Sequence, residues 1–137
     1  MTGSSIFPDS NIPVYLLEQD QKRRELVTSY IGKDYIISTQ VVSENVNVCM
    51  KKLKMAKETA FNHGSFLMEA FALSYITDET IKQAFSISLK YGLSYWDSLI
   101  VSSAIENNCA KVYSEDMQHG QLIEKVRVIN PFTEAGI

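Results

Sequence analysis

Four acidic residues stand where apolar segments end or helices begin, spread along most of the chain. They are Asp9, Glu44, Asp97 and Asp116. A carboxylate placed against apolar neighbours loses hydration, which is costly unless an opposite charge compensates for it. If the fold brings these side chains together, they form an oxygen-only site for a hard divalent cation. Sites of this kind hydrolyse phosphodiester bonds by orienting the phosphate and activating a water molecule.

The chemistry of this acidic set favours Mg²⁺ or Mn²⁺. Two carboxylates about 4 Å apart repel each other by roughly 4 kcal/mol at an effective dielectric constant near 20. Four together cannot all stay ionised without a cation or raised pKa values. All-oxygen ligation disfavours Zn²⁺, and the two histidines, His63 and His119, lack the spacing of zinc ligands. We therefore expect one or two Mg²⁺ or Mn²⁺ ions bound by the four acids.

Alternating strands and helices are expected to position these acids. Apolar and β-branched stretches predict strands at 4–8, 35–38, 111–114 and 126–129. Helical spacing and capping residues predict helices at 21–31, 39–55, 65–71, 77–90 and 94–107, with a shorter one from Pro13. Asn62-His63-Gly64 is read as a helix breaker, and 72–76 as either a helix extension or a short strand.

This alternation indicates an α/β fold with a mainly parallel central sheet. Ligands of such sheets bind beyond the carboxyl ends of the strands. Asp9 and Asp116 lie at those ends, Glu44 lies about one helical turn past the second strand, and Asp97 lies in the first turn of a helix. All four side chains are thus expected at one edge of the sheet.

Each acid also has a purely structural interpretation. Asp97 completes a capping box with Ser94, Asp9 suits a turn, Glu44 suits an exposed helix face, and Asp116 suits a solvated loop. The functional hypothesis therefore depends on all four acids occurring at the same kind of place in an alternating fold.

Composition narrows the class of protein to which this chain belongs. The chain has 137 residues, 45% hydrophobic and 21% charged, which fits one globular domain over 1–137. The net charge of −3 gives no overall basic surface for nucleic acid. Cys49 and Cys109 lie far apart and suit buried thiols better than a disulfide. No leader-like start and no apolar run of about 20 residues is present, so we expect a cytoplasmic protein without membrane contact.

Two further groups suit RNA contact, although each has a simpler explanation. Lys51 and Lys52 follow Glu44 on the same predicted helix and form either a solvated face or an edge that contacts phosphates. His119 follows Asp116 closely and serves either the loop or the site.

The residues around the acids resemble the PIN-domain nuclease family, especially the VapC-like toxins of bacterial toxin–antitoxin pairs. The similar segments are Asp9-Ser10-Asn11-Ile12, Ser38 to Glu44, Tyr91 to Asp97, Tyr113 to Gly120, and Ile129-Asn130-Pro131-Phe132. They occur in the family's order and span nearly the whole chain. One departure is Pro8 before Asp9, because proline cannot donate a hydrogen bond within a central strand.

The resemblance implies a three-layer α/β/α fold and a metal-dependent endoribonuclease that leaves a 5′-phosphate on RNA. It also implies a toxin role, a small antitoxin partner and a homodimer. Matched position by position, Asp9, Glu44, Asp97 and Asp116 correspond to the family's acidic quartet, and Asn11 and Ser114 to supporting polar positions. Lys51, Lys52 and His119 are the candidate substrate contacts.

Two other classes of function stay open at this point. One is a PIN-fold RNA-binding or scaffold protein that keeps its acids without a toxin role. The other is an α/β phosphatase or phospho-receiver domain, which needs an aspartate after a strand and a lysine near the pocket; Lys90 and Lys111 are the available lysines.

Overall fold

The computed structural model describes residues 5–137, apart from the side chain of Lys33. In this part of the chain six strands form one sheet in the order β3-β2-β1-β4-β6-β5. The strands are β1 (Ile6–Pro8), β2 (Gly32–Ser38), β3 (Phe71–Ser74), β4 (Lys111–Tyr113), β5 (Leu122–Ile123) and β6 (Val126–Ile129). Among the described strands, only β5 pairs antiparallel, with β6. The predicted mainly parallel sheet is confirmed.

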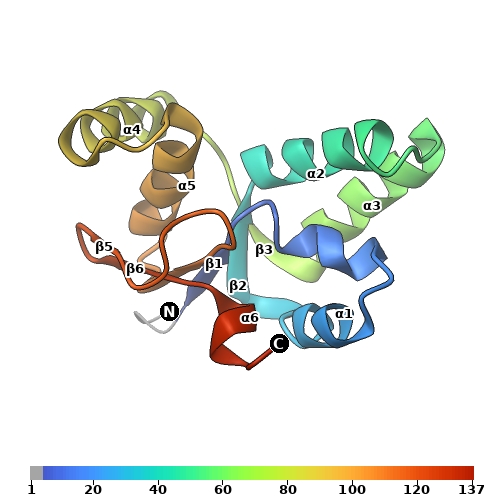
Figure 1. The fold of residues 1–137 in the computed structure, drawn as a ribbon. Coiled ribbons are helices and arrows are strands. Elements are labelled where there is room, and N and C mark those ends of the chain that lie inside the picture. Colours follow the sequence, from blue (N-terminus) through green and yellow to red (C-terminus); the bar gives the residue numbers. More distant parts are fainter. Residues whose placement is uncertain (1–4) are drawn as a thin grey trace.

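Helices cover this sheet in layers. They are α1 (Gln21–Thr28), α2 (Thr39–Lys51), α3 (Lys57–Ala70), α4 (Asp78–Tyr91), α5 (Tyr95–Glu106) and α6 (Pro131–Glu134), with a 3-10 turn, η1 (Pro13–Leu17), after β1. In Figure 1, α4 and α5 lie together above the strands and α1 and α6 lie below them, while α2 and α3 form a second pair beside β2 and β3. This is the mixed α/β architecture predicted from the sequence.

The core lies between the central strands and the helices. Phe7 of β1, Val112 of β4 and Val128 of β6 are fully buried, as are Val101 and Ala104 of α5. A parallel sheet covered on both faces requires such continuous apolar strands. The same burial forces polar residues at the strand ends to find partners within the protein.

Local sequence explains why α4 forms where predicted. The Thr77 hydroxyl accepts from the Thr80 N–H, and the Thr80 hydroxyl accepts from the Thr77 N–H, which completes a capping box. Gly92 ends the helix with φ of 72°, a left-handed conformation that glycine adopts without steric cost.

The predicted break at Asn62-His63-Gly64 is wrong, because α3 runs through it from Lys57 to Ala70. Gly64 serves a close helix contact instead: a Cβ at this position would lie 2.8 Å from Cγ2 of Val46 on α2. The glycine therefore lets α3 approach the helix that carries Glu44.

Other boundaries also differ from the prediction. Helix α1 ends at Thr28 and not at the predicted residue 31, and α2 ends at Lys51 and not at the predicted residue 55. The open choice for 72–76 is decided in favour of a strand, β3. The segment from Pro13 is a 3-10 turn, and β5 and α6 were not predicted. Ser4, in the predicted first strand, lies outside the described residues.

Pro8 is accommodated in the central strand by its position near the strand's end. The Asp9 N–H donates to the Tyr113 carbonyl on β4 at 2.8 Å. Since successive residues of a strand direct their N–H groups to opposite sides, the Pro8 nitrogen faces β2. The register between β1 and β2 is set at Ile6↔Tyr35, before Pro8 is reached. No β1–β2 pair in the described region involves Pro8.

Candidate active site

Asp9 lies just past the carboxyl end of β1 and is only 5% exposed. Its Oδ1 accepts from the Ser10 N–H at 2.7 Å, and its Oδ2 accepts from the Ser114 hydroxyl at 2.8 Å. Burial is the main cause that raises the pKa of Asp9 to about 6, and the negative charges of Asp97 and Glu44 add to it. The hydrogen bonds from Ser114 and Ser10 act in the opposite direction.

Ser114 and Asn11 organise the loop after β4. The Ser114 hydroxyl donates to Asp9, and its oxygen accepts from the N–H groups of Asp116 and Met117, both at 3.2 Å. Oδ1 of Asn11 accepts from the Glu115 N–H at 3.3 Å. The loops that follow β1 and β4 are thus joined directly. The supporting role of Ser114 and Asn11 in the site stays a prediction.

Asp97 lies in the first turn of α5. Its N–H donates to the Ser94 hydroxyl at 3.1 Å, so the helix is capped through the backbone of Asp97. Within the described residues, no hydrogen bond joins the Asp97 carboxylate to the Ser94 N–H, so the reciprocal half of the predicted capping box is missing. Partial burial raises the pKa of Asp97, and the charge of Asp116 contributes in the same direction.

The four acids form one electrostatically connected set. Asp9 interacts with Asp97 and with Glu44, and Asp97 interacts with Asp116. Glu44 and Asp97 are partly exposed and Asp116 is exposed, so the set opens from the buried Asp9 towards solvent. Nε2 of Gln40 on α2 also donates to the Trp96 carbonyl at 3.3 Å, which joins the helix of Glu44 to the helix of Asp97.

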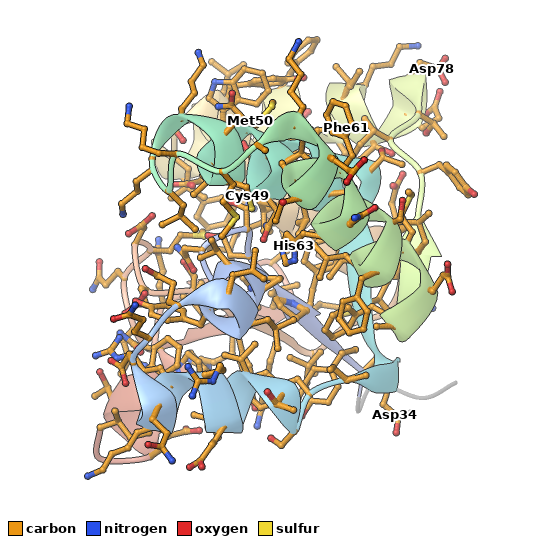
Figure 2. The ribbon with its side chains drawn as sticks, turned by 90° about the vertical axis from the view of Figure 1, so that its right-hand side faces the viewer. Asp34, Cys49, Met50, Phe61, His63 and Asp78 are labelled. Atoms are coloured by element: carbon orange, nitrogen blue, oxygen red, sulfur yellow. The ribbon has the colours of Figure 1, made fainter. Side chains whose placement is uncertain are left out.

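Sequence reasoning missed a buried polar pair that supports this edge. Nδ2 of Asn45 donates to the Ser10 carbonyl at 2.9 Å, and Oδ1 of Asn45 lies 3.1 Å from Nε2 of His63. In Figure 2, His63 lies between the ribbons of α3 and η1. Burial lowers the pKa of His63, which favours the neutral ring with its Nε2–H directed at Asn45. A polar residue directly after Glu44 was the available signal, but its partners are distant in sequence.

The four acids offer only carboxylate oxygens, the donor type that suits a hard divalent cation. Among residues 5–137, no three His, Cys, Asp or Glu side chains already converge as ligands of one ion. Mg²⁺ usually keeps several waters and binds through only one or two carboxylates. No ion pair in the described region involves any of the four acids. A cation would relieve both the burial of Asp9 and the repulsion among its neighbours.

The candidate substrate contacts lie farther out. Lys51 and Lys52 are exposed at the end of α2, and Lys51 is seven residues, about 10 Å of helix, beyond Glu44. Nδ1 of His119 accepts from the Asn130 N–H at 2.9 Å, so this ring fastens its loop to the end of β6. Contact of these three residues with RNA stays a prediction.

The lysines required by a phospho-receiver are wrongly placed for that role. Lys111 begins β4, at the end of the strand opposite the acids. Nζ of Lys90 pairs with Glu124 at 2.9 Å, on the exposed side of α4. The receiver alternative therefore lacks its basic partner at the acidic edge.

The sequence matches a known protein family. The family model described as PIN domain matches residues 6–124, more than half of the chain and a span that contains all four acids. The chain belongs to the PIN-domain family. The resemblance predicted from the short motifs is thereby confirmed. No curated protein matches the chain in a sequence search.

Solved structures share the fold of this PIN domain. Mycobacterium tuberculosis VapC20, described as a sarcin–ricin loop cleaving toxin, has a TM-score of 0.67 at 15% identity and covers 82% of this chain and 90% of its own. A toxin–antitoxin complex from Klebsiella pneumoniae has a TM-score of 0.67 at 18% identity, covering 90% and 95%. A DNA-bound VapBC from Salmonella typhimurium has a TM-score of 0.66 at 15% identity, covering 91% and 96%.

Proposed function

We propose that this PIN domain is a divalent-metal-dependent endoribonuclease and the toxin of a toxin–antitoxin pair. The observation that carries the proposal is the buried carboxylate of Asp9, at the carboxyl edge of a parallel sheet, with Asp97 and Glu44 close enough to raise its pKa. A buried acid with other acids beside it is an unfavourable arrangement that a bound cation reverses.

Asp9, Glu44, Asp97 and Asp116 are the proposed metal ligands, directly or through water. Bound Mg²⁺ or Mn²⁺ supplies an activated water and stabilises the charge that develops on the phosphate. The chain's own contribution is to hold its carboxylates in place. Ser114 and the Ser10 N–H fix both oxygens of Asp9, and the cap at Ser94 fixes the first turn that carries Asp97.

RNA as the substrate is supported by a structural neighbour. VapC20 is described as cleaving the sarcin–ricin loop, and it shares the fold over most of both chains. Attack of water on the phosphorus breaks the bond to the 3′ oxygen, which leaves a 5′-phosphate and a 3′-hydroxyl. The exposed Lys51 and Lys52 are proposed to contact phosphates beside the cleavage point.

An antitoxin and a second copy of the chain are the proposed partners. The Klebsiella neighbour is a toxin–antitoxin complex, and the Salmonella neighbour is a DNA-bound VapBC. Large apolar side chains are exposed on α4 and at the start of α5: Leu89 is 88% exposed, Trp96 60% and Phe85 52%. An apolar patch of this kind suits a protein interface. None of the helices in residues 5–137 has the length and apolarity needed to cross a membrane.

Nuclease assays with Asp97→Asn test the function. The wild-type protein should cleave RNA in Mn²⁺ or Mg²⁺ and stop when EDTA is added. Asp97→Asn should lose cleavage and stay folded, because the change removes a ligand and relieves repulsion while the backbone cap at Ser94 persists. Intact far-ultraviolet circular dichroism checks the fold. Full activity of purified Asp97→Asn would refute the role of this acid, and an inactive wild type would favour the scaffold alternative.

A further inference from the structure

A fifth acid, Glu115, stands between Ser114 and Asp116 but takes no part in the acidic set. Its Oε1 accepts from the Tyr15 hydroxyl at 2.7 Å, and its Oε2 forms an ion pair with Nη1 of Arg23. The side chains of Arg23 and Glu115 are 23% and 24% exposed. A pair so sheltered is screened by solvent far less than a surface pair.

Arg23 is itself held in one geometry. Its Nε lies 3.2 Å from Oδ2 of Asp20, and its guanidinium carbon lies 4.5 Å from the ring centre of Phe132 on α6. Phe132 in turn contacts the Tyr15 ring at a centroid distance of 5.0 Å. A planar guanidinium stacked on an aromatic ring and paired with a carboxylate is a role that lysine does not reproduce.

The Glu115 contacts join two distant parts of the chain to one loop. Tyr15 belongs to η1 and Arg23 to α1, and they reach Glu115 across sequence separations of 100 and 92 residues. Burial and then Glu115 raise the pKa of Tyr15 to about 12, so its hydroxyl keeps its proton at any physiological pH. The same loop presents Ser114 to Asp9 and carries Asp116.

We propose that Arg23 and Tyr15 are positioning residues that withdraw Glu115 from the acidic set and fix the loop carrying Ser114 and Asp116. The inference rests on the proposed nuclease function of the neighbouring acids. Without Arg23, Glu115 becomes a free carboxylate beside the metal ligands. It then attracts the cation and lets the loop shift, so metal binding is strengthened while turnover falls.

Arg23→Met and Arg23→Met/Glu115→Gln test this coupling, with Arg24→Met as the matched control. Arg24 is the next residue of α1, but its Nη1 donates to the Glu18 carbonyl at 2.7 Å. Arg23→Met should lower kcat roughly 10- to 100-fold, the scale of a small misplacement of catalytic groups, with KM for RNA nearly unchanged. The double variant should recover most of kcat, because the freed charge is gone. Arg24→Met should match the wild type.

Mn²⁺ affinity, measured by calorimetry without RNA, provides a second readout. Arg23→Met removes the positive charge that neutralises Glu115, so it should tighten Mn²⁺ binding a few fold. Adding Glu115→Gln to this variant should restore the wild-type affinity. If the wild type binds Mn²⁺ but cleaves no RNA, the proposed function fails and this readout still decides the coupling. Tyr15→Phe keeps the ring packing on Phe132 and should lower kcat in the same direction by a smaller factor, so the test survives if Arg23→Met does not fold.

Two outcomes overturn the proposal. If Arg23→Met raises KM and reduces the salt dependence of binding, and Glu115→Gln does not rescue it, then Arg23 contacts RNA. If kcat and melting temperature fall together in Arg23→Met and in Arg23→Met/Glu115→Gln, and Mn²⁺ affinity does not change, then the Arg23–Glu115 pair only stabilises the fold.

Discussion

Replacing the buried acid Asp9 by asparagine should stabilise the metal-free protein at pH 8. With a pKa raised from 3.8 to about 6, ionised Asp9 is disfavoured in the folded state. Since each factor of ten in an acid constant corresponds to about 1.4 kcal/mol, this ionisation costs roughly 3 kcal/mol of stability. An asparagine side chain has one acceptor oxygen where aspartate has two, so it loses one of the hydrogen bonds from Ser10 and Ser114. This loss costs about 1 kcal/mol. The net gain is roughly 2 kcal/mol.

The pH dependence of this stability gain shows whether ionisation of Asp9 is its cause. A raised carboxyl pKa means that the penalty is complete above about pH 6 and shrinks as the folded protein takes up a proton below that value. It disappears below the unfolded-state pKa of 3.8. At pH 4.5 the remaining penalty is about 1 kcal/mol, which the lost hydrogen bond cancels. Asp9→Asn should therefore match the wild type in stability at pH 4.5 and exceed it at pH 8.

Thermal unfolding in EDTA at both pH values is the assay. A gain of roughly 2 kcal/mol corresponds to about 6–8 °C for a chain of this length. Asp34→Asn, which removes an exposed carboxylate from β2, controls for the change in net charge. Equal destabilisation of Asp9→Asn at pH 4.5 and pH 8 would refute the claim that burial and neighbouring acids strain this carboxylate.

Two further changes test the supports of the site. Gly64→Ala should lower the free energy of unfolding by about 1–2 kcal/mol in denaturant titrations, because the new Cβ meets Val46 at 2.8 Å. Ser65→Ala, at the exposed next position of α3, is the control and should leave the free energy of unfolding unchanged. An unchanged free energy of unfolding in Gly64→Ala would contradict close packing of α2 on α3. Ser114→Ala should move the acidic limb of the pH–activity profile to higher pH, because the hydroxyl that lowers the pKa of Asp9 is removed; an unmoved limb would show that this bond does not control Asp9.

Strand-end residues were the predictable part of the site. The apolar stretches before Asp9 and Asp116 read as strands, and the parallel arrangement followed from alternation with helices. Both predictions used local sequence patterns, and the structure has the corresponding strands and the parallel arrangement. The capping residues of α4 and α5 were predictable for the same reason, because Thr77 and Ser94 act on backbone groups within one helical turn.

The missed features depend on tertiary contacts. Gly64 reads locally as a helix breaker, and only the proximity of Val46 reveals why a glycine stands inside α3. Asn130-Pro131 reads as the end of a strand, yet Asn130 also caps α6 through the N–H groups of Phe132 and Thr133. The partners of Asn45 and Glu115 come from other elements, so no local pattern could reveal them.

Titration of the metal-free protein with Mn²⁺ at pH 7.5, followed by melting temperature, tests most directly whether the acids share a cation. Binding to the folded state alone adds about 2.7 kcal/mol at 100 times the dissociation constant. The wild type and Asp34→Asn should therefore become more stable as Mn²⁺ rises, whereas Asp9→Asn should respond weakly or not at all. An unchanged wild-type melting temperature at millimolar Mn²⁺, or an equal rise in Asp9→Asn, would contradict a cation site built around Asp9.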